Sequence, residues 1–151
     1  MDILDNNTHT GIFDSVASGL PEGGKLRRRD PSQLAPLVLA YIGDTVFDLY
    51  VRTGLILSTD LTAHGLHMEA AKKVCAGAQA AAFRKIEGML TDEEAAVFRR
   101  GRNSHMGTVP RNASIADYRA ATGIEAVIGW LYLRGEDARI AELMRAMLSD
   151  E

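Results

Sequence analysis

The feature that most constrains this chain is a mostly apolar run with two acidic residues four positions apart, Leu39-Ala40-Tyr41-Ile42-Gly43-Asp44-Thr45-Val46-Phe47-Asp48. On a helix, that spacing places Asp44 and Asp48 about one turn apart on one face, with Ala40 one turn earlier. A carboxylate within an apolar run is costly to bury unless a positive group meets it. We therefore predict that Asp44 meets a divalent metal ion.

The residues on either side of Asp44 predict a long helix. Asp30-Pro31 is a good helix start, because Asp can cap free amide groups and Pro is tolerated at the first helical position. Thr53-Gly54 marks the expected end or bend of this helix. Between these points the apolar residues follow helical spacing and cover more than a single stripe. Such a helix must be central to the fold or lie in a subunit interface.

Helical patterns also recur in the later part of the chain. Residues 62–86 are rich in alanine and have few breakers, so we predict a second long helix there. Thr91-Asp92-Glu93-Glu94 has the form of a capping box, with a helix continuing to about Arg99. The last helices are expected over residues 114–133 and 136–148. Because there are no convincing alternating strands, the predicted fold is all-α.

Length and composition indicate one domain. A chain of 151 residues with 46% hydrophobic content can form one core but not two ordinary ones. Residues 1–29 have turn and coil composition without sustained periodicity, so we predict a flexible tail that closes with the basic run Lys25-Leu26-Arg27-Arg28-Arg29. The globular domain is expected over residues 30–151.

The cysteine content and the lengths of the apolar runs indicate the cellular compartment of the protein. The single Cys75 cannot form an intramolecular disulfide, and the amino terminus lacks the pattern of a signal peptide. No apolar run approaches the length of about 18 residues needed to cross a bilayer. We therefore expect a cytoplasmic protein with no membrane partner.

A second apolar helix also carries one acid, because Glu125 lies in the run from Thr122 to Leu133. Packed together, Asp44 and Glu125 would supply oxygen ligands for Mg²⁺, which prefers hard donors and keeps several waters. A polar, basic loop precedes this helix, and residues 99–119 contain five arginines against one acid in a chain of net charge −3. These arginines would attract a phosphodiester backbone. The residue types fit a metal-dependent phosphodiesterase, and helix packing with buried ion pairs is the alternative.

The two acidic runs resemble motifs of a known family. Tyr41-Ile42-Gly43-Asp44-Thr45-Val46 resembles the signature helix of the ribonuclease III domain, and Glu125-Ala126-Val127-Ile128-Gly129-Trp130-Leu131-Tyr132-Leu133 resembles its second acidic motif. The resemblance covers about residues 33–148, in the same order throughout. Four further segments are similar to the Mini-III ribonucleases, compact bacterial relatives without a double-stranded-RNA-binding domain: Leu66-His67-x-Glu69-Ala70, Arg99-Arg100-Gly101-Arg102-Asn103, Gly107-Thr108-Val109-Pro110-Arg111-Asn112-Ala113 and Tyr118-Arg119.

The resemblance implies an all-α ribonuclease III endonuclease-domain bundle, a homodimer that cleaves double-stranded RNA with Mg²⁺. The expected substrate is the paired ends of a large-subunit ribosomal RNA precursor, with a ribosomal protein as a further candidate partner. Asp44 and Glu125 match the catalytic acids of the family and would hold the metal. Full-length ribonuclease III domains have further acids one turn earlier, where this chain has Ala40 and Thr122, a depletion that Mini-III members share.

The loop arginines are the expected RNA contacts. Because A-form RNA is read mainly by its shape, its backbone and its 2′-hydroxyl groups, these side chains need not recognise bases. We expect the loop to be mobile until RNA arrives. The residues predicted to contact phosphates are Arg100, Arg102 and Arg111.

Other residues of the matched motifs are given structural interpretations. Asp48 stands where Mini-III relatives often have Glu, and we interpret it as a solvated or ion-paired helix residue rather than a ligand. His67 and His105 are candidates for contacts with RNA or metal, but they lack metal-ligand spacing. Ile124 replaces a usual Phe, which does not argue against activity.

Three other functions are compatible with parts of the sequence. A non-catalytic, ribonuclease-III-like RNA-binding or ribosome-associated protein would keep the arginines, but the intact Asp44 and Glu125 count against it. A helical nucleotide pyrophosphatase usually displays paired Glu residues along a helix, whereas Glu93-Glu94 are adjacent at a helix start. A purely structural helical dimer leaves the basic loop unexplained.

Overall fold

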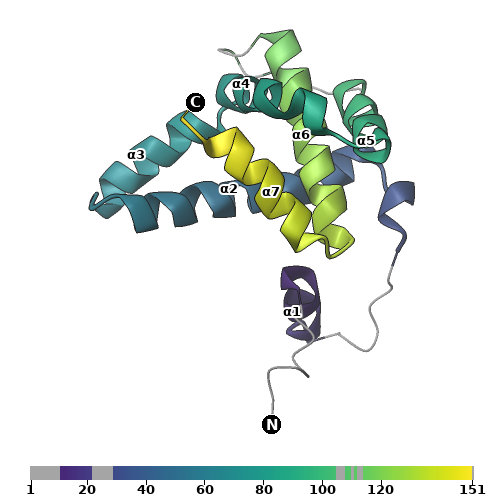
Figure 1. Ribbon diagram of the computed structural model, residues 1–151, viewed down its shortest axis with the longest axis horizontal. Coiled ribbons are helices and arrows are strands. Elements are labelled where there is room, and N and C mark those ends of the chain that lie inside the picture. Colours follow the sequence, from purple (N-terminus) through teal and green to yellow (C-terminus); the bar gives the residue numbers. More distant parts are fainter. Residues whose placement is uncertain (1–10, 22–28, 105–107, 110, 112–113, 151) are drawn as a thin grey trace.

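Every regular element in the described part of the chain is a helix (Figure 1). The computed structural model describes residues 11–21, 29–104, 108–109, 111 and 114–150. The elements are α1 (Ile12–Ser18), η2 (Pro31–Gln33), α2 (Pro36–Ser58), α3 (Ala63–Val74), α4 (Ala76–Ile86), η3 (Glu87–Met89), α5 (Asp92–Arg102), α6 (Ile115–Leu133) and α7 (Asp137–Leu148), where η marks short 3-10 turns. The all-α prediction is confirmed. None of these described helices combines the length and apolar character needed to cross a membrane.

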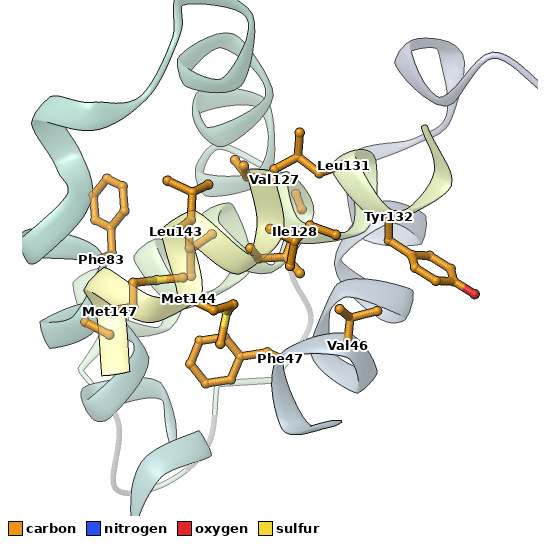
Figure 2. Packing of buried hydrophobic residues seen from close by; sticks show 14 of the residues in the cluster. Val46, Phe47, Phe83, Val127, Ile128, Leu131, Tyr132, Leu143, Met144 and Met147 are labelled. Atoms are coloured by element: carbon orange, nitrogen blue, oxygen red, sulfur yellow. The ribbon is translucent and has the colours of Figure 1, made fainter. Parts of the chain in front are cut away.

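Helix α6 is the centre of the bundle. It packs against α2, α4, α5 and α7. Every residue from Ala121 to Tyr132 is buried except Glu125, which is half-buried. Figure 2 shows Val127 on α6 near Leu143 of α7, within one continuous apolar core. The acid in this helix is therefore surrounded by apolar residues along its own chain.

Helix α2 buries one face and exposes another. Leu39, Phe47 and Val51 are buried in the core. On another face Tyr41 is 80% exposed, and near the end of the helix Leu57 is 81% exposed. We predicted that this helix would be central or lie in an interface. The central position belongs to α6, and the second apolar face of α2 is open in the single chain.

The crossing of α2 and α6 is a contact between backbones. A Cβ atom at Gly43 would lie 1.7 Å from the carbonyl oxygen of Glu125, and one at Gly129 would lie 1.9 Å from the carbonyl oxygen of Leu39. These distances are far below any real Cβ contact, so only glycine permits the crossing at either position. The crossing brings Asp44, the neighbour of Gly43, beside α6.

The predicted start of α2 is wrong, and the helix does not end at Thr53-Gly54. Asp30 caps a helical turn by accepting a hydrogen bond from the Ser32 amide at 2.9 Å, but that turn is the short η2, and Leu34 leaves it in an extended conformation. Helix α2 begins only at Pro36, which suits the first helical position. It continues through Gly54 to its end at Ser58, because one glycine costs a long helix only about 1 kcal/mol.

The single helix predicted over residues 62–86 is two helices. Cys75 is extended, with φ −70° and ψ 158°, and it separates α3 from α4. Helix α3 packs mainly on α2, whereas α4 packs mainly on α6. The break is therefore tertiary in origin, because one straight helix could not reach both partners.

Helix α5 begins as predicted and ends later. The Thr91 hydroxyl accepts a hydrogen bond from the Glu94 amide, and the Glu94 carboxylate accepts one from the Thr91 amide, so the capping box is confirmed. The helix passes its predicted end at about Arg99 and reaches Arg102. Arg100 and Arg102, predicted to lie in a loop, are therefore helical.

A short helix lies within the predicted tail. In α1, the Phe13 ring meets the Tyr132 ring edge to face with centroids 5.6 Å apart, and the Ile12 amide donates to Asp137 Oδ2 at 2.9 Å. These contacts place α1 at the end of the bundle where α6 and α7 meet (Figure 1). The prediction of coil is wrong for this helix, and residues 1–10 and 22–28 lie outside the described residues.

Candidate active site

A cavity of about 570 Å³ opens beside α2, α4 and α6. Asp44 of α2 and Glu125 of α6 both line it, so the fold brings the two predicted acids together. The backbone contact between Gly43 and α6 explains why they meet, since it fixes the crossing one residue before Asp44. The other polar lining residues are Gln79, Asp117, Tyr118 and Thr122.

The two acids have different surroundings. Asp44 is exposed to solvent, whereas Glu125 is half-buried and within hydrogen-bonding reach of Asp44. Burial, followed by the hydrogen bond and charge of Asp44, raises the pKa of Glu125 to about 9, although a hydrogen bond from Gln79 acts against this rise. In the metal-free protein, the Glu125 carboxyl group is therefore protonated near neutral pH.

Gln79 is a site residue that the sequence analysis missed. Its Nε2 donates to Oε2 of Glu125 at 3.3 Å, and the residue is only 2% exposed. One signal in the sequence pointed to it, because Gln79 is a single amide among the alanines of residues 78–82. A lone polar residue in such a run needs a buried partner.

Asp44 and Glu125 are a donor set that fits one hard divalent cation. Two carboxylates in hydrogen-bonding contact repel each other when both are ionised, and a cation between them would remove that repulsion. Among the residues that the structure describes, there is no group of three or more His, Cys, Asp or Glu side chains that could hold a metal ion. Water would supply the other ligands, as is usual for Mg²⁺.

The positions one turn before the two acids contribute no carboxylate. Ala40 is 7% exposed and belongs to the apolar core. Thr122 is 6% exposed, and its hydroxyl donates to the carbonyl oxygen of Tyr118 at 3.0 Å. Neither of these two positions therefore adds a carboxylate to the cavity.

Arg100 makes contacts within the protein. Its guanidinium donates to the carbonyl oxygens of Ser32 and Leu34 at 3.3 and 3.1 Å. Trp130 of α6 donates to the hydroxyl of the same Ser32 at 3.0 Å. Together these bonds tie the segment before α2 to α5 and α6. A structural role for Arg100 was not predicted from the sequence.

The other two predicted RNA-binding arginines have fewer restraints. Arg102 lies over the Phe98 ring at 5.8 Å from its centroid, and its Nε donates to the side chain of Asn103 at 3.2 Å. Arg111 is exposed. Both guanidinium groups are at the surface, as contact with a phosphate backbone would require.

Asp48 and His67, two of the remaining candidates, do not line this cavity. Asp48 forms an ion pair with Arg52 at 2.9 Å on α2, in agreement with its interpretation as an ion-paired helix residue. His67 lines a separate hollow of about 220 Å³ beside α2 and α3. His105 lies outside the described residues.

Comparison with known proteins relates the chain to one family. Residues 37–136 match the family model described as "Ribonuclease III domain". The Mini-ribonuclease 3 of Clostridium tetani is 44% identical over 84% of this chain and 85% of its own length, and that of a Thermoanaerobacter species is 43% identical over 74% and 78%. A crystal structure of a Fusobacterium nucleatum protein superposes with a TM-score of 0.71 at 28% identity, covering 78% of this chain and 93% of that one.

Proposed function

Because the chain belongs to the ribonuclease III family, we propose that it is a Mg²⁺-dependent endoribonuclease that cleaves double-stranded RNA. The observation that carries the proposal is the meeting of Asp44 and Glu125 in one cavity at the α2–α6 crossing. The match to the ribonuclease III domain, over residues 37–136, includes both acids. A catalytic function also explains why Asp44 and Glu125 lie together, whereas a purely structural role does not require two neighbouring acids.

In the proposed mechanism, the carboxylates of Asp44 and Glu125 would hold the metal in the cavity that both residues line. A bound Mg²⁺ supplies charge neutralisation and a water of lowered pKa for attack on phosphorus. Gly43 keeps the two carboxylates in register, because it fixes the helix crossing beside them. Hydrolysis of this kind leaves a 5′-phosphate and a 3′-hydroxyl end, and it needs no nucleophile from the protein.

The arginines supply the proposed RNA contacts. Arg102 and Arg111 are exposed, and their guanidinium groups suit the phosphates of an A-form duplex. Arg100 is also exposed, but two of its N–H donors already bind Ser32 and Leu34. We therefore propose that Arg100 adds positive charge and fixes the segment before α2, while Arg102 and Arg111 bind phosphates directly.

A homodimer is part of the proposal. Helix α2 presents several large apolar side chains to solvent, and an exposed apolar face of this extent is typical of a protein interface. Pairing two copies through α2 would place two cavities near one duplex, one for each strand. The side chains that support this interface are Leu37, Val38, Tyr41, Leu49, Ile56 and Leu57.

The proposed substrate is a precursor of large-subunit ribosomal RNA, cut in its paired ends. This choice rests on the similarity to the Mini-ribonuclease 3 proteins. A ribosomal protein bound to the precursor is a candidate partner. Cleavage of a synthetic duplex without ribosomal protein would show that such a partner is not required for the reaction itself.

One cleavage assay tests the proposed activity. Blunt-ended double-stranded RNA is incubated with the protein in Mg²⁺ or in chelator, alongside Asp44→Asn, Glu125→Gln and the control Asp48→Asn, whose carboxylate pairs with Arg52. We expect cleavage only in Mg²⁺, loss of cleavage in the first two variants, and full activity in the control. Cleavage that persists in both site variants would overturn the catalytic assignment. RNA binding without cleavage would favour the non-catalytic RNA-binding protein.

A further inference from the structure

Gln79 contacts Glu125 directly from a third helix. Its Nε2 donates to Oε2 of Glu125 at 3.3 Å across the interface between α4 and α6. The amide is buried at 2% exposure, and it lines the same cavity as Asp44. One carboxylate oxygen of Glu125 is therefore held by an amide, and the group also lies within hydrogen-bonding reach of Asp44.

The break between α3 and α4 makes this contact possible. Because Cys75 is extended, α4 leaves the direction of α3 and packs on α6. Gln79 lies in the first turns of α4, among small alanine side chains that allow α4 to approach α6 closely. The local chain geometry thus directs one long polar side chain toward the cavity.

A buried amide at this position has a chemical purpose that an apolar residue could not serve. Burying an amide without a hydrogen bond is destabilising, so the contact with Glu125 is what makes Gln79 tolerable in the interface. The amide is neutral and donates, so it can orient a carboxylate without adding a third negative charge beside Asp44. Carboxylates that bind metals are commonly held in place by such hydrogen bonds.

We propose that Gln79 is a positioning residue, whose amide holds the Glu125 carboxylate in the orientation that binds the divalent metal. This inference rests on the proposed function, because it takes Asp44 and Glu125 as the metal ligands. The contact acts on metal binding and not on the chemical step. Its loss should therefore weaken metal affinity about 10- to 100-fold, the usual effect of removing a partner of a metal ligand.

The test compares Gln79→Met with Gln33→Met, a matched control. Methionine keeps a similar side-chain length and removes the donor, while Gln33 lies exposed in η2. Binding of Mn²⁺ to the full-length chain without RNA is measured by electron paramagnetic resonance, since carboxylate sites suited to Mg²⁺ also bind Mn²⁺. Thermal unfolding in chelator confirms that each variant is folded. Cleavage is then followed as Mg²⁺ is raised.

For Gln79→Met we expect Mn²⁺ affinity to fall about 10- to 100-fold, with a matching rise in the Mg²⁺ concentration at half-maximal cleavage. The kcat at saturating Mg²⁺ should return close to that of the unaltered protein. Gln33→Met should change neither the Mn²⁺ affinity nor the Mg²⁺ concentration at half-maximal cleavage. If Gln79→Met does not fold, Gln79→Asn decides by the same criteria, because its shorter side chain withdraws the donor.

Three results would overturn the inference. The Mn²⁺ affinity of Glu125→Gln shows whether the role of Gln79 alone has failed or the proposed metal site as well. Unchanged Mn²⁺ affinity in Gln79→Met, with affinity lost in Glu125→Gln, would reject the role of Gln79 and leave the metal site intact. A fall in kcat that excess Mg²⁺ does not restore would also reject a role in metal binding. Unchanged Mn²⁺ affinity in Glu125→Gln would reject the metal site itself, and the role of Gln79 with it.

Discussion

Gly43 of α2 meets the backbone of Glu125 in α6 so closely that a Cβ atom at Gly43 would lie 1.7 Å from the Glu125 carbonyl oxygen. The contact joins the two helices at the place where Asp44 and Glu125 line one cavity. The relative position of the two acids therefore depends on a residue without a side chain.

Substitution Gly43→Ala should disrupt both stability and activity. The added methyl group would meet backbone atoms, which cannot move aside as a flexible side chain can, so we expect a loss of about 3 kcal/mol, at the upper end of overpacking costs. The matched control is Gly54→Ala on the same helix, where a Cβ would meet nothing within 4 Å. This control should gain about 0.5–1 kcal/mol from helix propensity. Urea unfolding of both variants measures the difference, and equal stability would contradict the packing argument.

The raised pKa of Glu125 predicts how the metal-free protein responds to pH. The folded pKa is about 9 against an ordinary value of 4.5, so between these values the folded state holds a proton that the unfolded state has lost. The contribution of Glu125 to stability is therefore greatest below its ordinary pKa and falls as pH rises toward 9. In Glu125→Gln this decline should disappear, because an amide does not titrate. Unfolding free energies in chelator across this range provide the measurement.

The control for that experiment is Glu87→Gln, which changes an exposed carboxylate in η3. Its stability should follow the pH dependence of the unaltered protein. A decline that persists unchanged in Glu125→Gln would mean that another group is responsible. Added Mg²⁺ should reduce the decline in the unaltered protein, since a cation favours the ionised carboxylate.

Local signals in the sequence were sufficient for much of the fold. Thr91 and Glu94 form the predicted capping box, and α6 ends at Leu133 as predicted. The acids within apolar runs also indicated the site, because Asp44 and Glu125 could be recognised from the sequence around each of them, without knowing which residues lie near them in the fold. Each of these features depends on residues close together in the chain.

Features set by distant contacts were not predictable in this way. Cys75 breaks a helix because α3 and α4 pack on different partners, and no residue at that position requires the break. Arg100 could not be distinguished from the other arginines until Ser32 and Leu34 were seen to accept its hydrogen bonds. Gln79 was missed for the same reason, since its function lies in a partner 46 residues away.

Arg100 and Arg102 should respond differently to alanine substitution. Arg100→Ala removes bonds to two backbone carbonyls, so it should cost about 1–2 kcal/mol of stability. Arg102→Ala should leave stability almost unchanged, weaken RNA binding, and reduce the slope of log affinity against log salt by about 1. Binding is measured with catalytically inactive Glu125→Gln protein at several salt concentrations. Arg145→Ala, an exposed arginine on α7, is the control, and a slope equal to that control would remove Arg102 from the RNA interface.

The pair of Glu94 and Arg139 should make the bundle sensitive to acid. Arg139 reaches both carboxylate oxygens of Glu94 at 2.8 and 2.9 Å, linking α7 to the start of α5, and Glu94 is only 3% exposed. Burial acts to raise the pKa of Glu94, but hydrogen bonds from Arg139 and Thr91 outweigh it, so the pKa is lowered. The carboxylate therefore stabilises the fold above its ordinary pKa, and this stabilisation is lost as pH falls through the lower folded value.

Substitution Glu94→Gln should cost about 3 kcal/mol near neutral pH, because it removes the buried carboxylate charge that pairs with Arg139 and leaves this arginine with only the exposed Glu142 carboxylate. The difference from the unaltered protein should shrink in acid, where Glu94 itself becomes protonated. Urea unfolding at a series of pH values measures it. The control is Glu142→Gln, which alters the other carboxylate on Arg139, one whose side chain is 57% exposed. It should change stability by less than about 0.5 kcal/mol. A Glu94→Gln penalty that is constant with pH would show that the lost contribution is packing or capping rather than the charge of the carboxylate.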